Sequence, residues 1–237
     1  MPSNSANSIN VNDNFNHSLS LQQISCVRGN TTLFSGLNLE ASSGNLIHIR
    51  GENGSGKTSL LRIIAGIASP EEGQVLWNDQ PLKKSESFAN DIAYLAHRDG
   101  IKLEMTTLQN LRFYQQLLSS SSEAELQKIL EKLDIKHIAF SLAKDLSFGQ
   151  KRRVGFARLL LSSAKLWLLD EPFTGIDIAG RKLLENICLN FLDQGGTIIM
   201  THHAEIENSL LSKKLSFLEL SDYNKMNQPS TKAETLA

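Results

Sequence analysis

The chain has 237 residues, a formal net charge of −1 and a hydrophobic content of 41%, enough for one globular domain with a sizeable core. The near-neutral charge excludes the basic surface that is typical of nucleic-acid binding. Only two cysteines, Cys26 and Cys188, are present, which excludes a disulfide scaffold or a cysteine-rich metal site and fits a reducing cytosol. No run approaches the roughly 18 apolar residues of a spanning helix, so no direct membrane insertion is expected.

Both ends of the chain differ in composition from its middle. Residues 1–18 contain six asparagines and four serines without a periodic apolar pattern. Such a segment buries too little apolar surface to fold, so it predicts a disordered tail. Residues 221–237 are expected to form a C-terminal tail, which leaves one folded domain over residues 19–220.

The first half of the domain shows mainly strand patterns and one helix. A turn-like Arg28-Gly29-Asn30 separates the first two strands, and a glycine-rich loop separates the third strand from the helix. The expected strands are Leu19–Val27, Leu37–Ala41, Leu46–Arg50, Gly73–Trp77 and Ile92–Leu95, and the expected helix is Ser59–Ala68.

The second half begins with helices and then alternates. Ser122 and Glu125 have capping-box spacing ahead of apolar residues that follow a helical period from Leu126 to Leu133. The expected helices are Leu108–Leu118, the segment near 126–133, a helix from Phe148 and Arg181–Leu192, and the expected strands are Leu166–Leu169 and Thr197–Met200. This alternation predicts an α/β fold with a mostly parallel sheet covered on both faces, and the helices near residues 100–160 predict a helical subdomain.

A glycine-rich loop follows the third strand. Gly51-Glu52-Asn53-Gly54-Ser55-Gly56-Lys57-Thr58 fits the phosphate-loop pattern GxxxxGK[ST] and continues with Ser59 into a helix. Glycines let successive backbone N–H groups turn towards phosphate oxygens, and the helix start adds the positive end of its dipole. Lys57 is expected to reach the β- and γ-phosphates, and the Thr58 hydroxyl to bind Mg²⁺. The alternative is an ordinary glycine-rich turn before a helix.

Two acidic residues follow the strand Leu166–Leu169. Because α/β folds place ligand chemistry at the carboxyl ends of parallel strands, Asp170 is expected to hold Mg²⁺ through water. Glu171 is then placed to orient or deprotonate an attacking water. Pro172 is expected to force Glu171 into an extended conformation and to end the strand. Alone, the acidic pair is also consistent with a strand-terminal turn.

The segment Leu146-Ser147-Phe148-Gly149-Gln150 begins a helix. Ser147 and Gln150 have capping-box spacing, which is a purely structural explanation. Three basic residues at positions 151–153 nevertheless oppose the helix dipole in the first turn. A helix start that gathers cations suits an anion, so the conflict favours a functional role for this segment.

Together these motifs resemble those of the ATP-binding cassette (ABC) ATPases. LSFGQ is similar to the LSGGQ signature of that family, and it begins 24 residues before Asp170, whereas Lys57 lies 113 residues before Asp170. The resemblance implies that Ser147, Gly149 and Gln150 contact ATP bound by a second copy. It also implies that Asp177 lies in a loop that crosses the dimer interface and that His202 is the switch histidine at the γ-phosphate. Without the other motifs, a capping or core histidine would be the preferred interpretation of His202, because His203 is adjacent and equally available.

Two positions depart from the general family pattern. His97 stands where the family has a glutamine that senses Mg²⁺ and the membrane partner. Val27 and Arg28 stand where it has an aromatic residue that stacks on adenine, although a guanidinium plane is also able to stack. Most of residues 19–220 nevertheless resembles the ATP-binding subunit of the bacterial haem exporter of cytochrome c maturation. The segments that carry this resemblance are Thr32–Leu37, Gly73–Trp77, His97 with Gly100–Lys102, Asn110–Tyr114, Ala157–Leu159 and Leu166–Thr174.

The resemblance implies a P-loop NTPase fold with a mostly parallel core sheet, an N-terminal antiparallel β subdomain and a helical subdomain. It implies ATP and Mg²⁺ as cofactors, with residues 51–59 around the nucleotide, Thr58 and Asp170 at the metal, and Glu171 and His202 as catalytic residues. A homodimer is expected to dock on multi-span membrane subunits near His97, at the cytoplasmic face of the bacterial inner membrane. ATP hydrolysis would drive haem export or delivery for cytochrome c biogenesis.

Two other functions stay open at the level of the sequence. One is an ABC ATPase of another transporter, for lipid, drug or peptide. The other is a soluble ABC-type assembly ATPase that couples closure to protein binding. Nucleic-acid repair is disfavoured, because the chain has neither a long coiled-coil insertion nor a basic surface.

Overall fold

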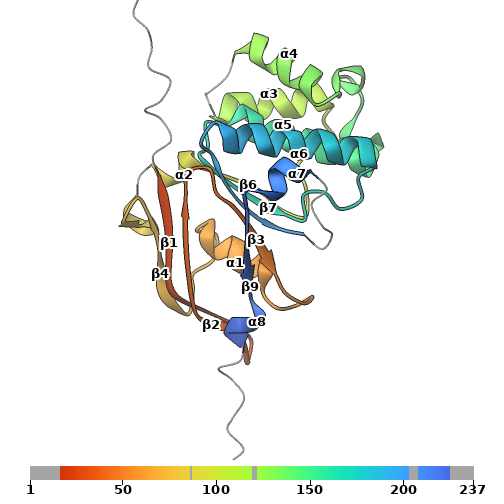
Figure 1. Cartoon of the computed structure of the whole chain (residues 1–237). Coiled ribbons are helices and arrows are strands. Elements are labelled where there is room, and N and C mark those ends of the chain that lie inside the picture. The colour runs from red at the N-terminus through yellow and green to blue at the C-terminus, as the bar shows by residue number, and fades with distance from the viewer. Residues whose placement is uncertain (1–16, 86, 119–121, 203–207, 225–237) are drawn as a thin grey trace, which may run out of the picture.

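Two β-sheets and a layer of helices make up the structure (Figure 1). The computed structural model describes residues 17–85, 87–118, 122–202 and 208–224. An antiparallel sheet lies on one side, a parallel sheet lies in the middle, and most helices lie beyond the parallel sheet. The arrangement confirms the predicted α/β class with its parallel core sheet.

The parallel sheet has the strand order β6-β7-β8-β3-β9. Its strands are β3 (Leu46–Arg50), β6 (Ile92–Leu95), β7 (Leu166–Asp170), β8 (Thr197–Thr201) and β9 (Leu215–Glu219). Every residue of β7 and β8 is buried, as expected of central parallel strands that are covered on both faces. Because β3 and β7 both pair in parallel with β8, the carboxyl ends of these three strands meet at one edge of the sheet.

Side chains of β7 alternate between two hydrophobic cores. Leu166 and Leu168 join the core that lies between the parallel sheet, the antiparallel sheet and α1 (Lys57–Ile64). Trp167 and Leu169 join the core beneath the helical layer. Because successive residues of a strand point to opposite faces, the continuous apolar run of β7 serves both cores.

The antiparallel sheet has the strand order β2-β1-β4-β5. Its strands are β1 (Ser18–Arg28), β2 (Thr31–Ser42), β4 (Glu72–Trp77) and β5 (Gln80–Pro81). The strand β2 begins six residues before the predicted Leu37, directly after the turn at Gly29-Asn30. The sheet packs its inner face over α1, which lies between the two sheets (Figure 1).

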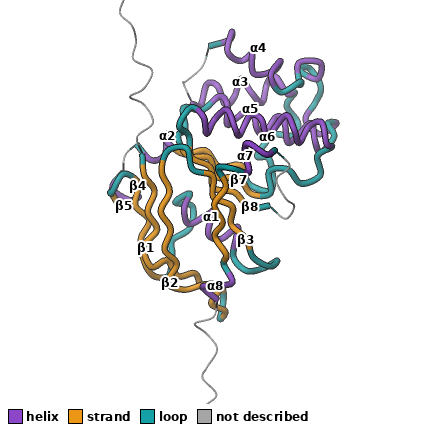
Figure 2. Tube along the Cα trace, in the orientation of Figure 1, coloured by secondary structure: helices purple, strands orange, loops and turns teal. Residues whose placement is uncertain are grey.

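The other helices gather mainly on the far side of the parallel sheet (Figure 2). They are α2 (Phe88–Asp91), α3 (Thr107–Leu118), α4 (Glu123–Lys132), α5 (Phe148–Leu161), α6 (Ile178–Asp193), α7 (Ser209–Ser212) and α8 (Ser221–Asn224). Three short 3₁₀ turns cover Leu82–Lys84, Lys136–Ile138 and Ala143–Asp145. The helices α3, α4, α5 and α6 share one core with Trp167.

The ends of the folded domain differ slightly from the sequence prediction. Ser18 begins β1, and the buried ring of His17 stacks on Trp77 with ring centroids 5.1 Å apart, so both residues belong to the fold. The remainder of the predicted N-terminal tail, residues 1–16, lies outside the described residues. The same is true of residues 225–237, and Ser221–Asn224 form α8.

The capping box at the start of α4 generates a stability prediction. The Ser122 hydroxyl accepts a hydrogen bond from the Glu125 backbone N–H, and the Glu125 carboxylate accepts one from the Ser122 backbone N–H. We expect Ser122→Ala to lower the free energy of unfolding by about 1 kcal/mol, measured by urea denaturation. Ser122→Asp, which restores a capping acceptor, should keep most of the wild-type stability, and equal losses in both variants would contradict the capping role.

Candidate nucleotide-binding site

The phosphate-loop residues connect the end of β3 to the start of α1. Gly54 and Gly56 have φ values of 84° and 103°, in the left-handed region that favours glycine. A Cβ atom on Gly56 would lie 2.9 Å from the Phe34 ring, so the loop also packs tightly against β2. The glycines therefore permit the turn that the sequence pattern predicts, and Gly56 also permits the close packing against β2.

The Lys57 side chain is hydrogen-bonded to the backbone at the start of the phosphate loop. Its ammonium donates hydrogen bonds to the carbonyl oxygens of Gly51 at 2.8 Å and Glu52 at 2.9 Å, and its side chain is largely buried. The side chain thus returns from the first residue of α1 towards the start of the loop. Its positive charge lies where the helix N-terminus is also positive, which makes this corner suitable for an anion.

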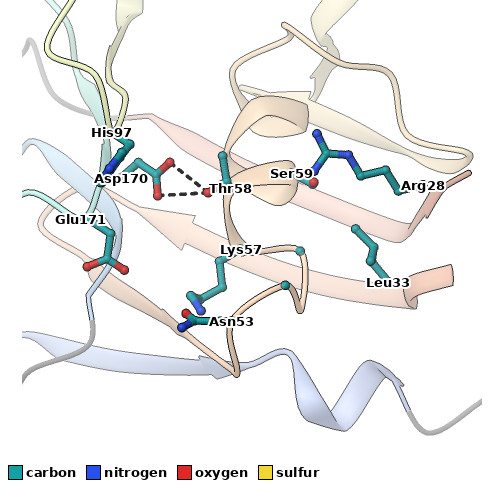
Figure 3. A pocket seen from close by; sticks show the side chains of 11 residues that line it. Arg28, Leu33, Asn53, Lys57, Thr58, Ser59, His97, Asp170 and Glu171 are labelled. Carbon is teal, nitrogen blue, oxygen red and sulfur yellow. Dashed lines mark hydrogen bonds between the residues drawn. The ribbon is translucent and has the colours of Figure 1, made fainter. Parts of the chain in front are cut away.

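A cavity of about 280 Å³ lies beside Lys57 (Figure 3). Asp170, Glu171 and His97 lie at one end of it, and Arg28 and Leu33 lie at the other. Its remaining lining residues are Asn53, Gly54, Gly56, Lys57, Thr58 and Ser59. Glu52 and Ser55 line an adjoining cavity of about 450 Å³ that Asn53 and Gly54 share.

Asp170 joins three elements at the end of β7. The Thr58 hydroxyl of α1 donates to its carboxylate at 3.0 Å, and the Thr201 hydroxyl at the end of β8 donates at 2.8 Å. The carboxylate is buried, so the two hydroxyls supply hydrogen bonds that water does not. The structure thus brings together the two predicted metal ligands, Thr58 and Asp170. Thr201 lies one residue beyond the predicted strand end.

Glu171 has a φ of 53°, which lies in the left-handed region. The expectation that Pro172 forces an extended conformation on it is therefore wrong. Hydrogen bonds hold the turn instead: the Glu171 N–H donates to the carbonyl and hydroxyl of Thr201, and Thr174 Oγ1 donates to Glu171 Oε2 at 3.0 Å. A positive φ in a residue with a Cβ atom is a strained conformation that such contacts must maintain.

His202 follows β8 and faces Glu171. Its Nδ1 lies 3.6 Å from Glu171 Oε2, and its ring packs edge-on against Phe173. Neither ring nitrogen has a hydrogen-bond partner among the residues that the structure describes. The buried imidazole thus lies beside a carboxylate. The neighbouring His203 lies outside the described residues.

His48, which no sequence motif indicated, supports His202 from the neighbouring strand β3. His48 is buried in β3, and its Nε2 donates a hydrogen bond to the His202 carbonyl at 2.8 Å. Burial lowers the pKa of His48, because removal from water disfavours the charged imidazole. The available signal was a single polar residue in the apolar strand Leu46-Ile47-His48-Ile49.

The signature segment does not line the cavity beside Lys57. Ser147 and Gln150 form the predicted capping box of α5, and a Cβ atom on Gly149 would meet no other atom within 4 Å. Phe148 is 46% exposed, and its ring packs on Gly175. Asp177 caps α6 by accepting from the Gly180 N–H, and its side chain is exposed.

The three basic residues of α5 each contact another part of the chain. Arg152 points inward and is 1% exposed, so its charge is not presented at the surface of the helix start. Arg153 pairs with Asp134, and Lys151 donates to the Lys144 carbonyl. Contacts of these side chains with other segments of the chain, between 7 and 53 residues away, thus account for the charge pattern that opposes the helix dipole.

Two negative findings concern the described residues only. None of the helices in the described part of the chain has the length and apolar character needed to cross a membrane. No cluster of three or more His, Cys, Asp or Glu side chains suited to a metal ion occurs among residues 17–85, 87–118, 122–202 and 208–224.

Comparison with known sequences gives a consistent result. A family described as "ABC transporter" matches residues 34–174. The cytochrome c biogenesis ATP-binding export protein CcmA of Histophilus somni is 44% identical over 200 residues, which cover 84% of this chain and 92% of the relative. The protein of the same description from Haemophilus influenzae is 41% identical over 199 residues, covering 83% and 94%.

Solved structures agree with the fold. An ABC transporter ATP-binding protein from Pyrococcus furiosus superimposes with a TM-score of 0.74 at 24% identity, covering 87% of this chain and 98% of that one. A nucleotide-free ATP-binding cassette from an ABC transporter gives 0.68 at 23% identity, covering 86% and 88%. The predicted P-loop fold with its mostly parallel core sheet is therefore confirmed.

The burial of His48 generates a prediction about pH. Because the folded protein holds the pKa of His48 below its ordinary value of 6.5, the unfolded chain takes up a proton first as pH falls. This group's contribution to stability is complete above about pH 6.5 and is lost as pH falls towards the folded pKa. We expect the wild type to lose more unfolding free energy than His48→Gln between about pH 7 and about pH 5, measured by urea denaturation. Identical pH profiles would contradict the prediction.

Proposed function

The chain belongs to the ABC transporter family, and we propose that it hydrolyses ATP to drive haem export or delivery for cytochrome c biogenesis. The observation that carries this proposal is the single cavity at which Lys57, Thr58, Asp170 and Glu171 meet. Two relatives that are more than 40% identical over most of both chains are described as cytochrome c biogenesis ATP-binding export proteins. Their description favours this role over other transporters and over a soluble assembly ATPase.

ATP fits the charge and shape of the cavity. Lys57 and the backbone N–H groups of residues 51–59 bind the phosphate oxygens, since they combine a fixed cation with the start of α1. The opposite end of the cavity is left for the base, where Arg28 and Leu33 supply a guanidinium plane and an apolar side chain.

Mg²⁺ fits the oxygen donors beside Lys57. Thr58 Oγ1 and the Asp170 carboxylate lie within 3.0 Å of each other, and hydroxyl and carboxylate oxygens are ligands that Mg²⁺ accepts together with water and phosphate. These two residues would hold the metal, whose positive charge would help to neutralise the phosphates.

Glu171 acts on the attacking water, and His202 contacts the terminal phosphate. Glu171 lines the cavity, so its carboxylate is placed to orient or deprotonate the attacking water. His202 Nδ1 lies beside that carboxylate, and the His48 hydrogen bond fixes the backbone of His202. Catalysis then depends mainly on positioning and charge neutralisation, as is general for phosphoryl transfer.

A second copy of the chain completes the site. Ser147, Gly149 and Gln150 lie at the start of α5, away from the cavity of their own chain, with Gly149 open to approach. A twofold arrangement places each signature segment over the phosphate loop of the partner and brings the exposed Asp177 to the interface. Binding of the γ-phosphate closes this dimer, and hydrolysis releases it.

Closure and release of the ATPase dimer would move the membrane subunits of the export complex. His97 stands at one end of the cavity, two residues after β6, and Arg152 of α5 in the helical layer donates to the carbonyl of the adjacent Ala96. We place the multi-span partner subunits at this side, with the ATPase peripheral to the cytoplasmic face of the bacterial inner membrane.

Glu171→Gln tests the catalytic step. The amide keeps the size of the side chain but cannot take up a proton, so turnover should fall by at least about 100-fold while ATP still binds. ATP should then hold the variant as a dimer, measured by light scattering during gel filtration. Glu131→Gln, the same change at an exposed carboxylate on α4, is the control and should behave as the wild type. A Glu171→Gln protein with normal turnover would exclude the proposed role.

Lys57→Ala tests the phosphate loop. Loss of the cation should weaken binding of a fluorescent ATP analogue by more than about tenfold, whereas Lys132→Ala on the exposed side of α4 should not. Cells that carry only the Lys57→Ala chain should fail to assemble cytochrome c, measured by haem staining of membrane fractions. Unchanged nucleotide affinity would remove the phosphate-loop assignment, and normal cytochrome c assembly would remove the export role.

A further inference from the structure

We propose that Arg152 is a positioning residue that holds the turn of Glu171 and joins it to the segment carrying His97, with Asp99 as its buried counter-charge. The inference rests on the proposed function, because it concerns the same site. Arg152 would thereby determine the geometry of the catalytic residues, although its own side chain does not line the cavity.

One side of the guanidinium holds the turn after β7. Its NH2 group donates to the carbonyl oxygens of Asp170 at 2.7 Å and Glu171 at 2.6 Å, and Nε donates to the Pro172 carbonyl at 3.0 Å. Three consecutive carbonyl groups thus turn towards one cation. This convergence occurs where Glu171 has its positive φ, so Arg152 supplies hydrogen bonds that maintain the strained turn.

The other side of the guanidinium holds the segment after β6. NH1 donates to the Ala96 carbonyl at 3.0 Å and to Asp99 Oδ1 at 2.7 Å. Ala96 immediately precedes His97, which lines the cavity. The rigid, planar guanidinium of Arg152 therefore connects the turn of Glu171 to the segment that carries His97.

The helix α5 brings a third part of the molecule into the connection. Its first residues form the signature segment, and Arg152 lies on the next turn. Gly155 permits the close approach, because a Cβ atom there would lie 2.9 Å from Leu95 and 3.3 Å from Asp99. Arg158, one turn further along, also donates to the Asp99 carbonyl.

The charges explain why both members of the pair are needed. Arg152 is 1% exposed and the Asp99 side chain 8% exposed, so the pair is shielded from water. A buried charge without its partner is strongly unfavourable, and a lysine provides one donor point where the arginine provides a fork. Arg152→Lys therefore keeps the charge but cannot reach all four carbonyl groups and Asp99 together.

The principal test uses Arg152→Lys in the full-length chain. If Arg152 positions Glu171, the variant should lose at least about tenfold in kcat, while KM and the affinity for ATP without Mg²⁺ stay within about threefold. Arg112→Lys, the same substitution at an exposed ion pair with Glu123, is the matched control and should keep wild-type kcat. An unchanged kcat in Arg152→Lys, or an equal loss of ATP affinity, would overturn the proposal.

A double-mutant cycle separates positioning from general support of the fold. In a Glu171→Gln background, Arg152→Lys should lower the single-turnover rate by less than about twofold, because the residue through which it acts is already removed. A further loss of tenfold in that background would show an effect independent of Glu171 and would overturn the proposal.

Hydrogen–deuterium exchange provides a readout that does not require ATP turnover. Arg152→Lys and the milder Asp99→Asn should both speed exchange of the backbone amides in residues 95–100 and 170–175, compared with Arg112→Lys. Faster exchange in only one of the two segments would exclude the connection. If the wild type lacks ATPase activity but both segments respond, the proposed function fails and the connection through Arg152 stands.

Discussion

The buried carboxylate of Asp170 determines how the site is assembled. It accepts hydrogen bonds from Thr58 at the start of α1 and from Thr201 at the end of β8, while its own backbone ends β7. Because an unsatisfied carboxylate is unfavourable away from water, these three elements can pack only in a register that brings both hydroxyls to it. These hydrogen bonds therefore place the phosphate loop beside the acidic residues in the folded chain.

The parallel sheet explains why the functional residues come from such distant parts of the sequence. The strands β3, β7 and β8 end at one edge, and the segments that leave them carry Lys57, Glu171 and His202. Hydrophobic cores on both faces of the sheet keep these ends in place. Hydrogen bonds hold the backbone at this edge of the sheet: His48 donates to the His202 carbonyl, and Arg152 donates to the Glu171 carbonyl.

The signature segment gives the molecule its second functional surface. Ser147 and Gln150 are used locally to cap α5, and the start of that helix is separate from the cavity beside Lys57. A division of this kind suits a protein whose site is completed by another copy of itself. Within one chain, Arg152 links α5 to the turn of Glu171 at the cavity. The same helix therefore carries the signature segment at its start and supports the backbone conformation of Glu171.

The sequence by itself determined the features that depend on neighbouring residues. The phosphate loop, the apolar strands that end at Asp170 and near Thr201, and both capping boxes are readable because their residues lie within eight positions of one another. The tertiary structure alone decided the positive φ of Glu171, the inward direction of Arg152 and the support from His48. Their contacts cross about 20 to more than 150 residues of sequence, and their favourable free energy exists only after both cores have packed. Local rules for proline and for helix dipoles therefore predicted a different backbone at Glu171 and a different role for Arg152.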